Sequence, residues 1–167
     1  MQQRPSPRER RRNLLSASAA AAAILAAVIL AEAASFPGLS PWYRDLLKPA
    51  FTPPSWLFAP VWTALYGLMG VALWRLLRMP EESAARRRAL TAFFAQLALN
   101  VAWPWLFFDL HRPGLALIDI YPQLLCIVLA LRACFAVDAT AAWCLAPLLV
   151  WVAYASALNL AIWHLNG

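Results

Sequence analysis

Charged residues are scarce in this 167-residue chain: they make up 13% of the sequence, against 63% for hydrophobic residues. A soluble domain carries about 25% charged residues, which hydrate its surface. The deficit therefore excludes an ordinary soluble domain and predicts a chain surrounded by lipid. The length allows about five spans of about 20 residues with short connections, and leaves no room for a separate soluble domain.

Histidine and cysteine are equally scarce. The two histidines, His111 and His164, fall in a turn and at the extreme end of the sequence. Haem and di-iron sites in helical bundles need several inward-facing histidines or carboxylates. The three cysteines, Cys126, Cys134 and Cys144, match no metal-binding spacing and are expected to be small apolar packing residues. The sequence therefore predicts no metal site, and no in-span serine or cysteine has a base to activate it for hydrolysis.

Positive charge is concentrated in arginine blocks beside apolar runs, and the net charge is +6. Basic residues that flank apolar spans are topology signals. No nucleic-acid-binding motif accompanies them, which argues against a nucleic-acid partner. A cytoplasmic N-terminus places most arginines on the cytoplasmic side: Arg8, Arg10 to Arg12, Arg75, Arg78, Arg86 to Arg88 and Arg132. Only Arg44, Lys48 and Arg112 fall on the other side, so the sequence predicts this orientation.

The long apolar runs predict an all-α integral membrane protein, a bundle of five transmembrane helices. A basic cytoplasmic tail, 1–13, precedes a membrane domain, 14–167. The predicted spans are 14–34, 56–77, 84–108, 115–137 and 140–165. Pro104 lies inside the third predicted span and should kink it, freeing a carbonyl that needs a partner in the bundle.

The first apolar run has two interpretations. A basic start, an apolar stretch and small residues around Glu32 are typical of a cleavable signal peptide. Alternatively, the run is a retained helix that packs closely through Ala19, Ala23 and Ala27 at four-residue intervals.

The segment 35–55 is predicted to be a structured loop between the first two spans. It contains five prolines together with Arg44, Asp45 and Lys48. Proline removes amide donors and breaks helices. A loop this long in a small bundle is frequently a functional lid.

Nine tryptophans are the most unusual feature of the composition. Those near predicted span ends fit an interfacial belt: Trp42, Trp56, Trp74, Trp143 and Trp163. Trp62, Trp103 and Trp151 lie deeper, where a buried indole N–H needs a partner. Helical spacing extends these three into stripes: Trp62, Tyr66 and Met69; Gln96, Asn100, Trp103 and Phe107; Trp151, Tyr154, Ala155, Leu158 and Asn159. The stripes indicate either contacts between helices, in which the amide side chains hydrogen-bond across the interface, or a pocket for a large, flat, mostly apolar ligand.

Asp119 is the one acid well inside a predicted span. An intramembrane carboxylate is a functional-site hypothesis by default. Because it lies about one turn from the predicted start of its helix, a capping role at the interface is the alternative. Glu32 ends the first predicted helix and is interpreted as interfacial.

Several dispersed motifs occur in a recognisable order. They are Trp42-Tyr43-Arg44-Asp45-Leu46-Leu47-Lys48-Pro49, Pro53-Pro54-Ser55-Trp56, Val61-Trp62, Leu65-Tyr66, Met69-Gly70, Gln96-Leu97-Ala98-Leu99-Asn100, Trp103-Pro104, Phe107-Phe108, Pro147, Trp151, Tyr154-Ala155, Leu158-Asn159 and Trp163. Together they resemble the translocator protein (TspO/MBR) family, which includes bacterial tryptophan-rich sensory proteins and the mitochondrial peripheral benzodiazepine receptor. The resemblance covers residues 40–166.

The resemblance implies a retained first helix, five spans, a homodimer, and a ligand cavity capped by the first loop. A bacterial inner (cytoplasmic) membrane is the expected location. Members of the family bind porphyrins, notably protoporphyrin IX, and some bind cholesterol or benzodiazepine-type drugs. By motif position, Trp42 and Tyr43 lie over the cavity, and Trp62, Asn100, Trp103, Trp151, Ala155 and Leu158 line it. The stripes add Tyr66 and Phe107 to this expected ligand-binding set.

The expected function is that of a porphyrin-binding sensory or regulatory membrane protein, with membrane lipid and a tetrapyrrole ligand as its partners. The alternatives are a transporter of porphyrins or other amphipathic molecules and light-dependent porphyrin breakdown, for which Trp42 and Trp151 match the implicated tryptophans. Arg44 and Lys48 are either partners for the propionates of the ligand or serve loop solubility. Sterol binding is doubtful because Leu160 and His164 replace the tyrosine and the basic residue of the family's motif, and Leu148 replaces the tyrosine that follows Pro147 in the family.

Overall fold

The computed structural model describes residues 6–38, 41–79 and 83–167. Its helices are α1 (Pro7–Gly38), α2 (Pro41–Asp45), the 3-10 turn η1 (Ser55–Leu57), α3 (Phe58–Leu77), α4 (Ala84–Pro104), the π-helical turn η2 (Trp105–Asp109), α5 (Pro113–Phe135) and α6 (Ala139–Asn166). Five of the helical segments are long and apolar enough to cross a membrane. The prediction of an all-α, five-span membrane protein is confirmed.

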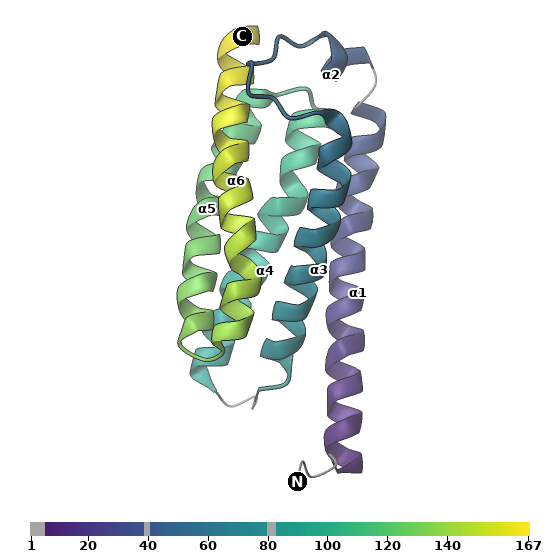
Figure 1. The fold of residues 1–167 in the computed structure, drawn as a ribbon, viewed down its shortest axis with the longest axis vertical. Coiled ribbons are helices and arrows are strands. Elements are labelled where there is room, and N and C mark those ends of the chain that lie inside the picture. Colours follow the sequence, from purple (N-terminus) through teal and green to yellow (C-terminus); the bar gives the residue numbers. More distant parts are fainter. Residues whose placement is uncertain (1–5, 39–40, 80–82) are drawn as a thin grey trace.

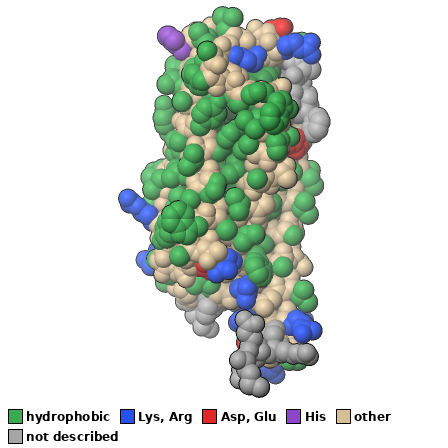
Figure 2. Space-filling view, viewed as in Figure 1, with side chains coloured by type: hydrophobic (Ala, Val, Ile, Leu, Met, Phe, Trp, Pro, Cys, Tyr) green, Lys and Arg blue, Asp and Glu red, His purple; other side chains and the backbone are tan. Residues whose placement is uncertain are grey.

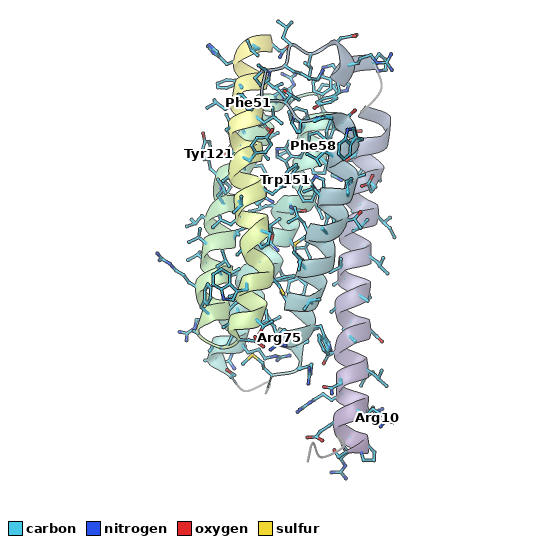
Figure 3. All side chains as sticks on the ribbon, in the orientation of Figure 1. Arg10, Phe51, Phe58, Arg75, Tyr121 and Trp151 are labelled. Atoms are coloured by element: carbon cyan, nitrogen blue, oxygen red, sulfur yellow. The ribbon has the colours of Figure 1, made fainter. Side chains whose placement is uncertain are left out.

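The five long helices form a closed ring around two clusters of buried apolar residues. α1 packs against α3 and α4, α3 against α6, α6 against α5, and α5 against α4 (Figure 1). The short helix α2 and the C-terminus lie at one end of the bundle, and the N-terminus lies at the other. We name these the lid end and the tail end. Phe51, Phe58 and Trp151 lie toward the lid end, whereas Arg10 and Arg75 lie toward the tail end (Figure 3).

The outer surface matches an environment of lipid. Hydrophobic side chains cover the middle of the face in Figure 2, and Lys and Arg side chains gather toward the two ends. Large exposed apolar residues occur on each long helix, including Ile29, Val71, Phe94, Ile118 and Val150. In water such a surface would be an aggregation liability, but between lipid chains it costs nothing.

α1 begins outside the bundle, where the sequence supplies a reciprocal N-terminal cap. The Ser6 amide donates to the Glu9 carboxylate at 2.8 Å, and the Glu9 amide donates to Ser6 Oγ at 3.3 Å. This capping box satisfies orphan amides of the first turn, and Pro7 adds a preset φ. The described part of the basic tail is therefore helical and continues into the first span (Figure 1).

The buried face of α1 differs from the expected one. Ala19 is exposed and Ala23 only half-buried. The residues that face the bundle are Ser16, Ala20, Ile24, Ala27, Ala31 and Ala34. Their spacings of four, four, three, four and three residues follow the 3.6-residue turn, whereas a strict four-residue repeat drifts around the helix.

Proline changes the course of the third span. α4 ends at Pro104 and continues as η2, in which Leu110 donates its amide to the Trp105 carbonyl at 2.9 Å. Proline cannot donate the amide of a regular helical turn, and a wider turn is one way for the chain to continue. Trp105, which the stripes did not include, ties η2 to α1 by donating its indole N–H to the Leu30 carbonyl at 3.0 Å. His111 then turns the chain with φ of 54° before α5 starts.

The segment between α1 and α3 was predicted to be a structured loop, and in the structure it is shorter than predicted and partly helical. α1 extends through Gly38, α2 occupies Pro41–Asp45, and η1 starts at Ser55. Residues 39–40, which fall in the predicted loop, and residues 1–5 of the predicted tail lie outside the described residues. We call residues 41–54 the lid.

Candidate ligand-binding site

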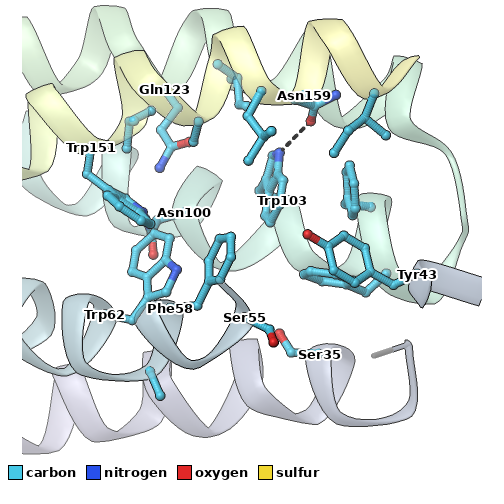
Figure 4. Close-up of a pocket in the computed structure, with 18 of the residues that line it drawn as sticks. Ser35, Tyr43, Ser55, Phe58, Trp62, Asn100, Trp103, Gln123, Trp151 and Asn159 are labelled. Atoms are coloured by element: carbon cyan, nitrogen blue, oxygen red, sulfur yellow. Dashed lines mark hydrogen bonds between the residues drawn. The ribbon is translucent and has the colours of Figure 1, made fainter. Parts of the chain in front are cut away.

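A cavity of about 320 Å³ lies at the lid end of the bundle (Figure 4). Every long helix and the lid contribute to its wall. The lining residues are Glu32, Ser35, Tyr43, Ser55, Phe58, Ala59, Trp62, Asn100, Trp103, Phe107, Phe108, Ile120, Gln123, Trp151, Val152, Ala155, Leu158, Asn159 and Ile162. Small-molecule pockets occupy about 300–1,000 Å³. This cavity stands at the lower end of that range, so a broad ligand would extend through its opening.

Aromatic rings form two opposing walls of the cavity. On one side, Trp151 meets Phe58 edge to face at 5.9 Å and Trp62 at 6.4 Å. On the other side, Trp103 stacks on Phe107 at 4.8 Å with an interplanar angle of 20°. Figure 4 shows Phe58, Trp62 and Trp151 grouped at one side and Trp103 with Tyr43 at the other. Such walls offer ring faces and edges to a flat apolar molecule.

Neutral amides stand between these walls. Asn100 is almost fully buried, and its Oδ1 accepts a hydrogen bond from the Tyr66 hydroxyl at 2.9 Å, which leaves its Nδ2 without a partner among the described residues. Gln123 is buried, points toward Asn100 and makes no hydrogen bond within the described part of the chain. A buried polar group without a partner costs about 1–3 kcal/mol. A ligand with one or two polar atoms that hydrogen-bond to this pair would remove that cost and bind more tightly.

A third amide sets the position of the Trp103 wall. Asn159 accepts the indole N–H of Trp103 at 3.0 Å and donates its own amide to the Pro113 carbonyl at 2.7 Å. The bond of Trp103 is drawn in Figure 4. Asn159 thus joins α4, the start of α5 and α6, and keeps the Trp103 ring in one orientation.

The lid covers the cavity from the side of α6 and the α4–α5 turn. Asn166 exchanges two hydrogen bonds of 2.9 Å with the backbone of Leu47. The Tyr154 hydroxyl donates to the Phe51 carbonyl at 2.8 Å. Inside the lid, Tyr43 reaches the cavity wall, and burial, with a smaller contribution from Tyr154, raises the pKa of its phenol. The Tyr43 hydroxyl therefore stays protonated and able to donate at neutral pH.

Comparison with known proteins agrees with this architecture. The model of the TspO/MBR family matches residues 19–164. The chain belongs to the TspO/MBR family. It is 40% identical over 126 residues to the tryptophan-rich protein TspO of Archaeoglobus fulgidus, covering 75% of this chain and 80% of that protein. It is also 39% identical over 128 residues to the translocator protein of Sus scrofa, covering 75% of each chain.

A third relative carries a different name within the same family. Protein CrtK of Rhodobacter capsulatus is 32% identical over 125 residues, which cover 75% of this chain and 78% of that protein. Together with the five apolar helices, membership of the TspO/MBR family establishes an integral, multi-pass membrane protein.

Most residues expected from the TspO/MBR resemblance and the stripes come together in the structure. Those that line the cavity are Tyr43, Trp62, Asn100, Trp103, Phe107, Trp151, Ala155 and Leu158. Trp42 lies outside the lining: its ring stacks on His111 at 4.3 Å and meets the edge of Phe107 at 5.7 Å. Tyr66 also lies outside the lining, one turn farther along α3 than Trp62. Its hydroxyl donates to Asn100, and its ring lies 5.7 Å from the ring of Trp62.

The cations of the lid do not reach the cavity. Lys48 lies over the Tyr43 ring at 4.6 Å, and its ammonium donates to the carbonyls of Arg44 and Leu46 at 3.1 and 3.2 Å. The Arg44 side chain is exposed and absent from the lining. In this closed arrangement Lys48 stabilises the lid, and neither cation faces the space between the aromatic walls.

Sequence reasoning missed Phe58, Gln123 and Ser55 as lining residues. Gln123 carried a usable signal, since an amide in the middle of an apolar span needs a partner. Glu32 was interpreted as interfacial. It is exposed, but it also lines the cavity, at the end of α1 near the lid.

Asp119 is neither a lining residue nor a helix cap. α5 starts at Pro113 with Arg112 as its N-cap, so Asp119 lies beyond the first turn. It is buried, and its Oδ2 has no hydrogen-bond partner among the described residues. The capping interpretation is therefore wrong.

Proposed function

We propose that the protein binds a tetrapyrrole of the porphyrin type in the lid-end cavity and acts through this binding as a sensory or regulatory membrane protein. The feature that carries the proposal is the space between the Phe58–Trp62–Trp151 wall and the Trp103–Phe107 wall. A flat, apolar ring system can stack on these faces. Membership of the TspO/MBR family supports a sensory or regulatory role in general, since members carry names such as translocator protein and tryptophan-rich sensory protein.

The polar groups of the cavity suit the same ligand class. Asn100 and Gln123 offer neutral hydrogen-bonding groups, and Tyr43 offers a phenol on the lid side. A macrocycle with polar edge atoms can use these groups while most of its surface contacts rings and aliphatic side chains. Because the cavity is small for a whole macrocycle, we expect the bound ligand to protrude through the opening.

The deciding experiment is a titration of the protein in nanodiscs with protoporphyrin IX, followed by quenching of tryptophan fluorescence. Trp62→Ala and Trp151→Ala remove one wall, so we expect saturable binding of one ligand per chain in the wild type and binding weakened about tenfold or more in each variant. Trp143→Phe is the matched control, because Trp143 is an exposed indole at the tail end, outside the cavity.

Non-saturating quenching that is equal in all four proteins would show that the porphyrin merely partitions into lipid. The stripes would then serve helix contacts alone.

Transport and light-dependent breakdown remain alternatives that the same preparation can test. Flux of porphyrin across vesicles containing the protein would favour transport. For breakdown, Trp151 lines the cavity, whereas Trp42 is separated from it by Phe107. A new absorbing product under illumination that Trp151→Phe abolishes and Trp42→Phe leaves intact would favour a role for Trp151 alone.

A further inference from the structure

The opening of the cavity is located by its exposed lining residues. Among the lining side chains, only Glu32, Ser55 and Ala59 are exposed, while the others are half-buried or buried. Glu32 belongs to α1, Ser55 to η1 and Ala59 to α3. The cavity therefore opens sideways, between α1 and the start of α3, near the level at which the lid begins.

The lid is attached to the bundle on the sides of the cavity that lie away from this opening. Its hydrogen bonds go to Asn166 and Tyr154 of α6, and its Trp42 ring stacks on His111 of the α4–α5 turn. Within the described residues, no hydrogen bond joins residues 41–54 to α1. A separation of α1 from the start of α3 would therefore break none of the hydrogen bonds that hold the lid on α6.

Glu32 is the one formally charged side chain among the described residues that line the cavity. No ion pair neutralises it in the part of the chain that the structure describes, where the single pair joins Arg75 and Asp138. The lid cations Arg44 and Lys48 do not line the cavity. A group that enters or protrudes through the opening therefore meets an uncompensated carboxylate at the edge of an apolar medium, where charges interact more strongly than in water.

We propose that Glu32 is a charge filter at the opening between α1 and α3: planar ligands that present a neutral or cationic edge there bind more tightly than the same ligands carrying a carboxylate. The inference rests on the proposed function, because it concerns ligands of the same cavity. It narrows the ligand class from planar amphiphiles in general to those whose protruding edge is not anionic.

The test compares protoporphyrin IX, which carries two propionates, with its dimethyl ester, which has the same ring and no carboxylate. Both are titrated into nanodiscs of zwitterionic lipid containing wild type, Glu32→Gln or Glu32→Lys, and empty nanodiscs are subtracted. Unit charges about 4 Å apart in water interact by enough to change an affinity about fivefold. We expect the affinity for the acid to rise about fivefold in Glu32→Gln and further in Glu32→Lys, while the affinity for the ester stays within about twofold.

Asp109→Asn is the matched control for the change in net charge. Asp109 is exposed at the lid end of the bundle but does not line the cavity, so its removal should leave the ratio of acid to ester affinity unchanged. If the ratio of acid to ester affinity changed equally in Asp109→Asn and Glu32→Gln, the proposed charge filter would be overturned, because the change would then reflect the net charge of the protein. Saturable binding of both ligands with the same ratio in wild type and both Glu32 variants would overturn it as well.

Absence of saturable binding for either ligand in the wild type would overturn the proposed function, and this inference with it.

The route of ligand entry between α1 and the start of α3 is tested separately with Ala59→Trp, which narrows the opening. We expect it to slow association of acid and ester by a similar factor, whereas an association rate equal to that of the wild type would place the entrance elsewhere.

Discussion

The lid half and the tail half of the bundle are formed by the same five helices, but their interiors differ. In the tail half, fully buried side chains such as Leu73, Phe93, Ile127 and Leu145 fill the space between the helices. In the lid half, aromatic rings stand on opposite walls with a cavity between them. The helices of the tail half meet mainly through aliphatic and small residues, with Phe93 among them.

The two ends are also held by different chemistry. At the lid end, neutral groups bind the lid: the Asn166 amide to Leu47 and the Tyr154 hydroxyl to Phe51. At the tail end, the Arg75 guanidinium pairs with Asp138 at 2.8 Å. A hollow end whose lid is held by neutral groups and a filled end that carries an ion pair suggest that binding and structural stability are separated along the bundle axis.

The largest expected effect comes from the same substitution made in both halves of α6. Leu145→Ala removes a fully buried side chain in the tail half and should cost about 2–4 kcal/mol of unfolding free energy, because a new void remains. Leu158→Ala enlarges a cavity that already exists, so its cost should be smaller by about 1 kcal/mol or more. Unfolding in detergent and porphyrin titration are the two measurements.

Ligand binding should respond in the opposite order. Leu158→Ala removes a lining contact and should weaken porphyrin binding, whereas Leu145→Ala should leave it unchanged in protein that remains folded. Equal stability losses together with equal binding would remove the distinction between a filled half and a hollow half.

A smaller effect tests close contact at the lid end. A Cβ on Gly114 would lie 2.9 Å from Nε1 of Trp163, so Gly114→Ala should displace the indole and cost about 1–3 kcal/mol. Gly67→Ala is the control, since nothing lies within 4 Å of its Cβ position and alanine favours the helix by about 1 kcal/mol. Thermal unfolding of both variants gives the comparison, and Trp163→Ala should rescue Gly114→Ala. A Gly114→Ala protein as stable as the wild type would show that the indole moves aside freely.

For the lid half, the sequence predicted which types of residue line the cavity better than it predicted how far the cavity extends. Indoles deep in predicted spans marked Trp62, Trp103 and Trp151, and all three line the cavity. The helical stripe also placed Tyr66 in the ligand-binding set. Tyr66 does lie beside Trp62, but it is buried, donates its hydroxyl to Asn100 and does not line the cavity. Spacing along one helix cannot reveal where a cavity ends, because that depends on side chains of the neighbouring helices.

The lid illustrates the same limit. Its prolines and charges predicted a structured segment, but its contacts depend on Asn166 and Tyr154, more than 100 residues away in the sequence. Arg44 and Lys48 were candidates for the propionates of a ligand on charge alone. The structure shows that two backbone carbonyls and the Tyr43 ring already bind the Lys48 ammonium. Local carbonyls compete with a ligand for such a cation, and residue type alone does not reveal that competition.

The smallest expected effect is a loss of stability at low pH, which should occur at the tail end and not at the lid end. Burial raises the pKa of Asp138, but hydrogen bonds from Arg75 and the Ala141 amide, together with the charge of Arg75, outweigh it and hold the pKa below its ordinary value. A carboxyl group whose pKa is lower in the folded state contributes stability above its unfolded pKa of about 4. That stability is lost as the pH falls through the folded pKa. Because a third of the Arg75 side chain is exposed, the loss should stay below about 1 kcal/mol.

Thermal unfolding between pH 6 and pH 3 should therefore show an acid-dependent loss in the wild type that is reduced in Asp138→Asn. The asparagine keeps an oxygen to accept from the Ala141 amide, so the N-cap of α6 survives while the ion pair is removed. Hydrogen exchange locates the effect, because amide protection should fall on acidification at Ala141 and stay constant at Leu47, which a neutral amide holds. Protection that falls equally at both amides would mean that acid loosens the whole bundle, and that the ion pair and the lid belong to one cooperative unit.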